Sequence, residues 1–188
     1  MTSNIVRIFD YQRPTHTIES VYLDVNIGDQ IEVISHLKVQ SNGGADWELN
    51  REFFETLALN VDGQPWQDLS ENAQSVTLHN LPDRFEFSAH TRFDPAANTH
   101  LSGIYLSDGI ICSQCEAEGF RRITYFPDRP DVMSLFTVKI TADQSRYPLL
   151  LSNGEEIAHE THADGTHSTT WHDPFPKPCY LFALVAGD

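Results

Sequence analysis

Apolar and polar side chains alternate along most of this chain, with a period of two residues. Five segments show the pattern: residues 21–27, 31–39, 57–61, 85–93 and 136–140. In the first of them, valine, leucine and isoleucine occupy every second position, with tyrosine, aspartate and asparagine between them. Because successive side chains of a strand point to opposite faces, this alternation predicts β-strands that bury one face.

Turn-forming residues separate these segments at short intervals. Glycine follows asparagine or aspartate at 62–63, 108–109, 153–154 and 164–165. A type I′ turn needs positive φ at both central positions, so we predict that Asn153-Gly154 and Asp164-Gly165 close β-hairpins. Many short strands joined by such turns are typical of an all-β protein, and we expect an antiparallel β-sandwich.

Two segments are candidates for a short helical turn. Pro130 and Asp131 precede Val132–Phe136, and proline and acidic residues are favoured in the first turn of a helix. Glu52–Leu57 is the second candidate. We therefore expect few helical residues.

The C-terminal run Tyr180–Ala186 is apolar on both faces. This pattern predicts a central strand that is covered on both sides. Chains seldom end two residues after such a strand, because termini are usually exposed and polar, so we expect the sequence to be part of a longer protein. No internal repeat or linker is visible, and we expect residues 1–188 to form one domain.

The chain is strongly acidic. Among its 188 residues, 27 are Asp or Glu and 12 are Lys or Arg, which gives a formal net charge of −15. A nucleic-acid partner requires Lys and Arg side chains at the phosphates, and anionic lipid would be repelled, so we expect neither partner. A positively charged ligand, such as a free amine, fits better. At 40% hydrophobic and 21% charged residues, the composition is that of a globular protein.

The sequence shows no sign of a membrane span or of secretion. No apolar run approaches the roughly 20 residues of a membrane-spanning helix, and Met1–Asp10 lacks the apolar core of a secretory signal. The three cysteines, Cys112, Cys115 and Cys179, are too few and odd in number for a disulfide scaffold. We therefore expect a cytoplasmic protein.

The segment His159–Ala163 resembles the zinc motif H-E-x-x-H but departs from it. The motif needs two histidines four residues apart on one helix face, whereas His162 follows His159 by three. The segment also precedes a predicted turn, and this spacing in a strand places the two side chains on opposite faces. We interpret these residues as a solvated hairpin without a metal.

Cys112 and Cys115 form a C-x-x-C pair. A structural zinc site needs four ligands, and Cys179 lies far along the chain with no partner beside it. A thioredoxin-like redox pair lies between the strand and the helix of a βαβ unit, which this strand-rich sequence lacks. We expect small buried side chains here.

The next residues contain two carboxylates, Glu116 and Glu118, with Gln114 before them and Gly119 after them. Amide and carboxylate oxygens accept hydrogen bonds, and an ammonium group offers three donors. The patch therefore suits a pocket for an amine, while a solvated acidic loop is the simpler alternative. A glycosidase pair is disfavoured, because its two carboxylates must flank the scissile bond from opposite sides.

Around and beyond this patch, several stretches are similar to the bacterial aminopeptidase N family of zinc metallopeptidases. They are Asp94–Thr99 (DPAANT), Leu101–Tyr105 (LSGIY), Cys112–Arg121 (CSQCEAEGFR), Asp128–Val132 (DRPDV) and Asp173–Asp188 (DPFPKPCYLFALVAGD). The resemblance runs over essentially the whole chain and is densest from Asp94 onward. It covers only the N-terminal domain of that family, whose members are several times longer.

The resemblance implies an all-β, saddle-shaped domain in which two fused sandwiches share a sheet. In the family, the zinc ligands belong to a catalytic domain that follows this one and carries H-E-x-x-H. The resemblance thus implies a parent enzyme that uses zinc to release N-terminal amino acids from peptides. This chain alone would bind no cofactor, carry no catalytic residue and be inactive. In the family, the N-terminal domain packs on the catalytic domain and helps to close the active-site cavity, so the resemblance implies the same role as a cap here.

The resemblance also implies a role for two residues of the acidic patch. Gln114 and Glu116 match the Gln and Glu of the family's Q-C-E segment, in which the Glu anchors the free α-amine of the substrate. A carboxylate–ammonium pair that is shielded from water strongly favours peptides with a free N-terminus. These two residues are the expected substrate-binding residues.

The alternative to a peptidase domain is a stand-alone β-sandwich that binds peptide or carbohydrate. Such a module would present an exposed aromatic platform, for which Trp47, Trp66 and Trp171 are the candidates. Ordinary core packing is the other interpretation of these tryptophans. The exposure of their rings distinguishes the two.

Overall fold

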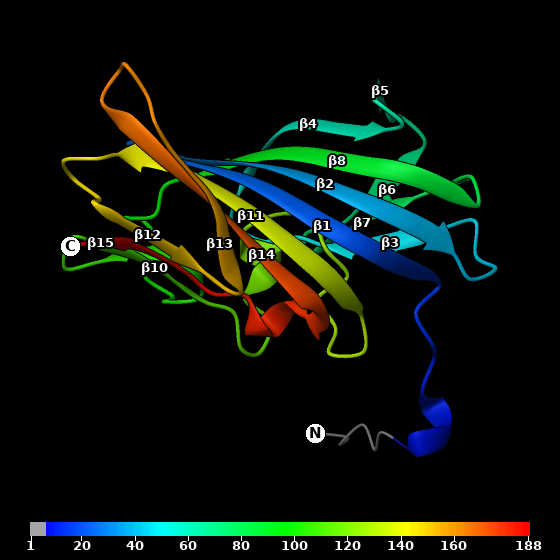
Figure 1. Cartoon of the computed structure of the whole chain (residues 1–188). Coiled ribbons are helices and arrows are strands. Elements are labelled where there is room, and N and C mark those ends of the chain that lie inside the picture. The colour runs from blue at the N-terminus through cyan, green and yellow to red at the C-terminus, as the bar shows by residue number, and fades with distance from the viewer. Residues whose placement is uncertain (1–6) are drawn as a thin grey trace.

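A computed structural model describes residues 7–188, and Figure 1 shows that the regular secondary structure of this part of the chain is almost entirely strand. Its helical segments are three single 3-10 turns: η1 (Ile8–Asp10), η2 (Phe120–Arg122) and η3 (Cys179–Leu181). Residues 1–6, which belong to the N-terminal stretch where we predicted no secretory signal, lie outside the described residues. No helix in the described range is long and apolar enough to cross a membrane. The all-β prediction is confirmed.

The strands form three sheets. The large sheet has the order β13 (Glu155–Thr161), β14 (Thr166–Pro178), β11 (Met133–Asp143), β1 (His16–Ile27), β2 (Ile31–Ser41), β8 (Arg84–Phe93), β4 (Glu55–Val61) and β5 (Gln64–Pro65). A four-stranded sheet has the order β12 (Leu149–Ser152), β15 (Leu184–Gly187), β10 (Ile110–Gln114) and β9 (Gly103–Ser107). A three-stranded sheet has the order β3 (Trp47–Asn50), β7 (Ser75–Leu78) and β6 (Leu69–Glu71).

The alternation of apolar residues accounts for the centre of the large sheet. Val25 lies opposite Val33 and Val21 lies opposite Leu37 in the antiparallel β1–β2 pair, and all four side chains are buried. On its other side, β1 pairs with β11 in parallel, so the large sheet is mixed rather than purely antiparallel. Parallel neighbours need a long crossover connection, and here most of the domain lies between these two strands.

Each small sheet covers one end of the large sheet, the four-stranded sheet at the left and the three-stranded sheet at the right of Figure 1. Trp47 of β3 packs its ring against Phe85 and Phe87 of β8, with centroids 5.6 and 5.5 Å apart. At the other end, β12 lies against β11 and β14. The buried apolar residues of the described range form one continuous core. This is the arrangement of two sandwiches that share a sheet.

The segment between β10 and β11 fills the space between the two small sheets. Phe120 of η2 is fully buried, and its ring centroid lies 6.0 Å from that of Phe136 and 5.4 Å from that of Phe182. The hydroxyl of Thr91 in β8 donates a hydrogen bond to the carbonyl oxygen of Ile123 at 2.8 Å. These contacts fasten the segment to the large sheet.

Both predicted helical turns are wrong. Val132–Phe136 runs into β11, preceded by a single turn in which the Val132 N–H donates to the carbonyl oxygen of Arg129 at 3.3 Å. Glu52–Leu57 leads into β4. In both segments, pairing with neighbouring strands outweighs a weak local preference for helix.

The two predicted hairpins have different outcomes. His162–Gly165 does close the β13–β14 hairpin, but of the Asp164-Gly165 pair only Gly165 has a positive φ (+87°), so the turn is not type I′. Asn153-Gly154 instead joins β12 to β13, which belong to different sheets, so this prediction is wrong. The Asp-Gly pairs at 62–63 and 108–109 have two positive φ values each and close the β4–β5 and β9–β10 hairpins.

The apolar C-terminal run differs from the predicted strand. Its first residues form η3, and only Leu184–Gly187 form β15, between β12 and β10. Leu184 and Ala186 are buried, whereas Val185 is 39% exposed. The strand is central in its sheet, as predicted, but only one of its faces is covered within the described part of the chain.

Candidate functional site

The two predicted site residues lie at a tight loop between β10 and η2. Gln114 is the last residue of β10, and the loop closes where the N–H of Gly119 donates to the carbonyl oxygen of Cys115 at 2.8 Å. The peptide bond between Glu116 and Ala117 is cis. A Cβ atom at Gly119 would come within 2.4 Å of the Gln114 carbonyl oxygen. The loop therefore requires glycine, because the chain approaches itself so closely there.

Side chains of the loop alternate between solvent and core. Gln114 and Glu116 are exposed, while Cys115 between them is buried. Nε2 of Gln114 donates a hydrogen bond to the backbone carbonyl oxygen of Glu116 at 3.2 Å, which leaves its Oε1 available as an acceptor. Within residues 7–188, the Glu116 carboxylate has no hydrogen-bond or ion-pair partner. The structure thus leaves two acceptor groups available at the surface, on side chains that are two residues apart in the loop.

The neighbouring carboxylate of Glu118 is paired. Its Oε1 lies 3.5 Å from Nη2 of Arg121, although the Glu118 side chain is 70% exposed, so the pair is weak. The same guanidinium contacts Asp128 through Nε at 3.2 Å. Glu116 is therefore the carboxylate of this patch that can receive a ligand without losing an existing partner.

The buried side of the loop contains thiols. Cys179 donates from Sγ to Oδ1 of Asp128 at 3.0 Å. Burial raises the pKa of Cys115 and of Cys179, and the negative charge of Asp128 raises the pKa of both further, so both remain protonated at neutral pH. Cys115 is a small buried side chain, as predicted, whereas Cys112 is only half-buried. All three cysteines are free.

The histidine-rich hairpin is not a metal site. His159 lies on β13, and His162 lies in the following turn, where its Nε2 is 3.2 Å from the hydroxyl of Ser168. Among residues 7–188, no three His, Cys, Asp or Glu side chains gather closely enough to hold a metal ion. This part of the chain therefore does not fit a zinc ion.

The tryptophans do not form an exposed platform. Trp47 is buried in the core. Trp66 and Trp171 are half-buried, and their indole N–H groups donate to the carbonyl oxygens of Asp68 and Leu150 at 3.0 and 3.1 Å. This is ordinary packing, and it removes the feature on which the stand-alone binding module depended.

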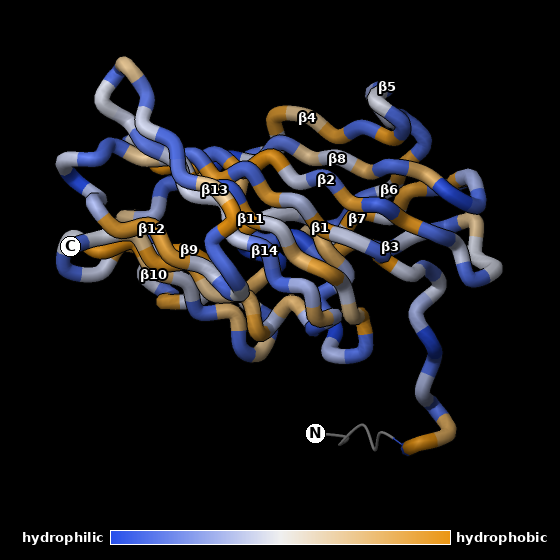
Figure 2. The backbone as a smooth tube through the Cα atoms, in the orientation of Figure 1, coloured by the Kyte–Doolittle hydropathy of each residue, from blue (hydrophilic) through white to orange (hydrophobic). Residues whose placement is uncertain are grey.

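The outer face of the four-stranded sheet is apolar and exposed, and the sequence pattern did not predict this. Leu149, Leu151, Val185 and Ile110 are 56%, 45%, 39% and 37% exposed, and we refer to these four residues as the apolar face. Figure 2 shows apolar backbone stretches along β12 and β10 next to the C-terminus. Leu151 lies beside Val185, which lies beside Cys112 of β10. Patches of this kind mark interaction surfaces.

Gln114 lies on the same side of the sheet as the apolar face. Ile110, Cys112 and Gln114 occupy alternate positions of β10, so their side chains point to one side. The apolar face therefore leads directly to Gln114 and to the loop that carries Glu116. A signal for this arrangement was present in the C-terminal run, which is apolar at odd and even positions alike.

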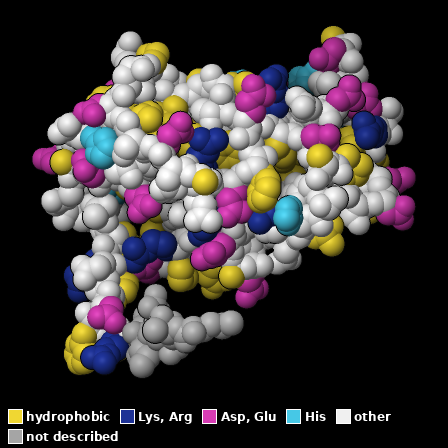
Figure 3. All heavy atoms as spheres, turned by 180° about the vertical axis from the view of Figure 1, so that it is seen from behind, with side chains coloured by type: hydrophobic (Ala, Val, Ile, Leu, Met, Phe, Trp, Pro, Cys, Tyr) yellow, Lys and Arg dark blue, Asp and Glu magenta, His cyan; other side chains and the backbone are white. Residues whose placement is uncertain are grey.

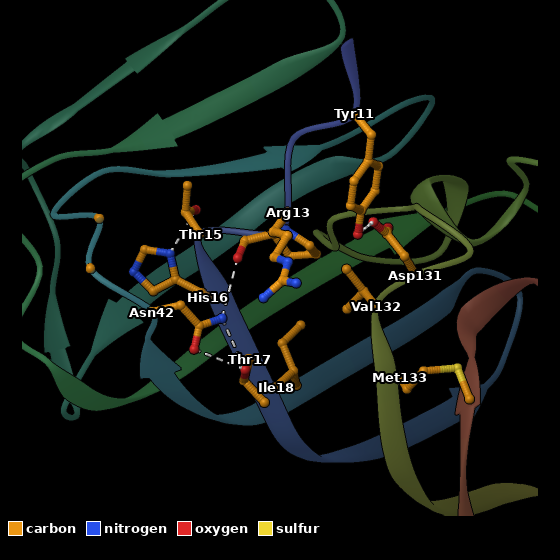
Figure 4. A pocket seen from close by; sticks show the side chains of 13 residues that line it. Tyr11, Arg13, Thr15, His16, Thr17, Ile18, Asn42, Asp131, Val132 and Met133 are labelled. Carbon is orange, nitrogen blue, oxygen red and sulfur yellow. Dashed lines mark hydrogen bonds between the residues drawn. The ribbon is translucent and has the colours of Figure 1, made fainter. Parts of the chain in front are cut away.

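A cavity of about 740 Å³ lies elsewhere, between the N-terminal segment and the start of β1. In Figure 4, Tyr11 points toward Asp131, and its hydroxyl donates a hydrogen bond to that carboxylate at 2.9 Å. His16 lines the cavity, and burial lowers its pKa. Neither Gln114 nor Glu116 lines this cavity, so it is separate from the loop.

Acidic side chains do not gather in one place on the face that Figure 3 shows. Asp and Glu side chains are spread over it and mixed with Lys and Arg. The net charge of −15 therefore does not mark a binding site by itself. The candidate site rests on the local geometry of the loop.

Comparison with known proteins assigns the chain to a family. The family described as the Peptidase M1 N-terminal domain matches residues 35–181. The chain belongs to this family. The membership confirms the resemblance seen in the sequence around Cys112–Arg121.

Aminopeptidase N proteins of two bacteria are similar to almost the whole chain. The protein of Escherichia coli (strain K12) is 43% identical over 182 residues, which cover 95% of this chain and 21% of that protein. The protein of Haemophilus influenzae is 44% identical over 185 residues, with the same two shares. The chain thus spans about a fifth of the length of these relatives.

Solved structures agree with the fold. The crystal structure of Legionella pneumophila aminopeptidase A in complex with aspartic acid matches with a TM-score of 0.90 at 31% identity, over 97% of this chain and 22% of that chain. An M1 zinc metallopeptidase from Deinococcus radiodurans matches with a TM-score of 0.79 at 18% identity, over 93% of this chain and 42% of that one, and supports the fold alone. The β-sandwich of an M1 N-terminal domain is therefore confirmed.

Proposed function

We propose that this chain is the N-terminal domain of a zinc-dependent aminopeptidase that releases N-terminal amino acids from peptides. Family membership and the identity to two bacterial aminopeptidase N proteins support this. The Legionella relative binds aspartic acid, a product of the kind that such an enzyme releases. The zinc would be held by a catalytic domain, since residues 7–188 do not fit a metal ion. Residues 1–188 would form one domain of a cytoplasmic enzyme. The continuous hydrophobic core of the described range supports a single domain.

In this proposal, Gln114 and Glu116 anchor the free α-amine of the peptide. The observation that carries this role is the unpaired Glu116 carboxylate of the described structure, on a loop where Gln114 hydrogen-bonds to the Glu116 backbone and keeps its Oε1 available. An α-ammonium group has three donors, so it can bind both oxygens at once. Glu116 then positions the peptide for cleavage and takes no part in bond chemistry.

The apolar face supports a second part of the proposal, in which the domain caps the active site by packing on the catalytic domain. Covering this face would exclude water near Gln114, which lies on the same side of the sheet. In the lower dielectric, the attraction between Glu116 and an ammonium group is stronger. A peptide with a blocked N-terminus would leave the carboxylate desolvated and unpaired, at a cost of about 2–5 kcal/mol.

The test is Glu116→Ala in the full-length enzyme, with Glu118→Ala as the matched control two residues away. We expect Glu116→Ala to lower kcat/KM for unblocked peptides about tenfold or more, because a charged pair with the substrate is lost. Zinc content should not change. Glu118→Ala should lower kcat/KM by clearly less than Glu116→Ala, because Glu118 pairs with Arg121 instead of the substrate. Unaltered kinetics of Glu116→Ala would show that the amine is held elsewhere.

A further inference from the structure

Behind the loop that carries Glu116 lies a buried carboxylate. The Asp128 side chain is 3% exposed, and it accepts three hydrogen bonds. Oδ2 accepts from the backbone N–H of Arg121 at 3.0 Å and from its Nε at 3.2 Å, and Oδ1 accepts from Sγ of Cys179 at 3.0 Å. The backbone N–H of Asp128 donates to Oδ1 of Asn50 at 3.0 Å. Asp128 therefore ties together η2, the C-terminal stretch and β3.

Arg121 connects this carboxylate to the loop. Its side chain is 13% exposed, and the guanidinium contacts both the buried Asp128 and the exposed Glu118, which belongs to the loop. Its Nη2 also donates to the backbone carbonyl oxygen of Asp128 at 3.3 Å. These two guanidinium contacts with Asp128 hold the charged group inside the domain, so the cation that Glu118 contacts has a fixed position.

A second connection runs through Cys115. This residue is buried directly between Gln114 and Glu116 in sequence, and it lies close enough to Asp128 that the carboxylate raises its pKa. The thiol of Cys179 is near Cys115 and is held by Asp128. The inward-pointing residue of the loop and Cys179 are thus both buried in the same core, and the two neighbours of Cys115 in sequence are exposed.

We propose that Asp128 is a positioning residue that sets the place of Gln114 and Glu116, by holding Arg121 against Glu118 of the loop and by holding Cys179 in the core that also contains Cys115. The proposal rests on the amine-binding function proposed above. It adds a residue that does not touch the substrate and that acts through the loop. A displacement of the order of 1 Å in a positioning group can change rates by up to about a hundredfold, so a remote residue of this kind has a measurable effect.

Replacing Asp128 by asparagine changes the balance around Arg121. The amide has one acceptor oxygen instead of two and carries no charge, so it cannot serve Arg121 and Cys179 equally. The mostly buried guanidinium then keeps one anionic neighbour in the described structure, Glu118, which is 3.5 Å away. An uncompensated cation is unfavourable, so we expect Arg121 to shift toward Glu118 and to displace the loop.

The experiment compares two inhibitors of the full-length enzyme, alanine hydroxamate and propionohydroxamate, which differ only in the α-amine. The ratio of the Ki of propionohydroxamate to that of alanine hydroxamate measures the amine preference. We expect Asp128→Asn to lower this ratio by about three- to tenfold while the Ki of propionohydroxamate and the zinc content stay unchanged. A residue that only stabilises the fold would lower Tm and leave the ratio unchanged, and that result overturns the proposal.

Two controls separate the possible failures. Glu116→Ala should lower the ratio by about tenfold, and if it does not, the amine-binding function itself is wrong. Asp131→Asn is the matched substitution three residues from Asp128, and because Asp131 pairs with Arg129 and Tyr11 instead of the loop, it should leave the ratio unchanged. An equal fall in Asp131→Asn would overturn the specific role of Asp128.

A second pair of variants applies if Asp128→Asn does not fold. Cys179→Ala removes the donor to Oδ1 of Asp128, whereas Cys179→Ser keeps a donor at that position. We expect the alanine variant to lower the amine preference by about threefold and the serine variant to restore most of it. Equal ratios in the alanine variant and the parent enzyme would overturn the proposal.

Discussion

Replacing glycine by alanine should destabilise the protein at Gly119, where the loop closes, but not at Gly28. Gly119 has φ −90° and ψ −20°, which alanine adopts without strain. A Cβ atom there would nevertheless lie 2.4 Å from the carbonyl oxygen of Gln114 and 2.8 Å from Cα of Cys115. Both are backbone atoms, so they cannot rotate away. At Gly28, the nearest atom to an added Cβ is the carbonyl oxygen of Gln30 at 3.4 Å, which is an ordinary contact.

The magnitude follows from two terms. Alanine restricts the unfolded chain and thereby stabilises the protein by about 0.4–1 kcal/mol at either position. Overpacking at Gly119 costs about 1–3 kcal/mol, because the loop must move to admit the methyl group. We therefore expect Gly119→Ala to lower the free energy of unfolding by about 1–2 kcal/mol, while Gly28→Ala leaves it unchanged or raises it.

Urea unfolding of the 188-residue chain, followed by tryptophan fluorescence, measures this difference. With a slope of about 2 kcal/mol per molar urea, the midpoint of Gly119→Ala should fall by about 0.5–1 M relative to the parent chain. A midpoint of Gly119→Ala equal to or above that of Gly28→Ala would refute the reasoning. It would mean that the Gly119–Cys115 hydrogen bond does not close the loop in solution.

Two further predictions concern pH and metal. Hydrogen bonds from Arg129, and then from Tyr11, hold the pKa of Asp131 below its usual range. A depressed pKa in the folded state contributes stability above about pH 4 that is lost as the pH falls through the folded value. The urea midpoint of Asp131→Asn should therefore lie further below that of the parent chain at pH 7 than at pH 2.5, and a constant gap would contradict the pairing. The 188-residue chain, incubated with zinc and then desalted, should retain no stoichiometric zinc and hydrolyse no aminoacyl-anilide. Hydrolysis by clean protein would contradict the assignment of the zinc ligands to another domain.

Much of the fold could be predicted from local pattern, because burial of one sheet face imposes a period of two on the sequence. Every second residue from Val21 to Ile27, and every second residue from Ile31 to Val39 in β2, is buried as that pattern predicts. The wrong predictions concern segments in which the local preference of the sequence differs from the strand pairing of the folded protein. Pro130 and Asp131 favour a helix start, but the residues after them have strands to pair with on both sides. Asn153-Gly154 has hairpin chemistry, but its two flanking strands join different sheets.

The candidate site could be predicted only in part. Gln114 and Glu116 were identified through the resemblance of CSQCEAEGFR, and no periodicity distinguishes Glu116 from Glu118. That distinction depends on Arg121, which pairs with Glu118 and leaves Glu116 free in the described structure. The role of Asp128 depends on Cys179, which is far away in the sequence. Such contacts exist only once the sheets have assembled.

The parallel pairing of β1 with β11 has a consequence for synthesis of the chain. Val21 pairs with Phe136. One long edge of β1 therefore stays unpaired while more than a hundred further residues are synthesised. At typical translation rates of about 5–20 residues per second, this wait is roughly 5–20 s. During that time, the edge of β1 presents a row of unpaired N–H and C=O groups, which is a template for pairing with another chain. Because the strands are synthesised in this order, the β1 edge at the centre of the large sheet can pair with another chain until β11 has been made.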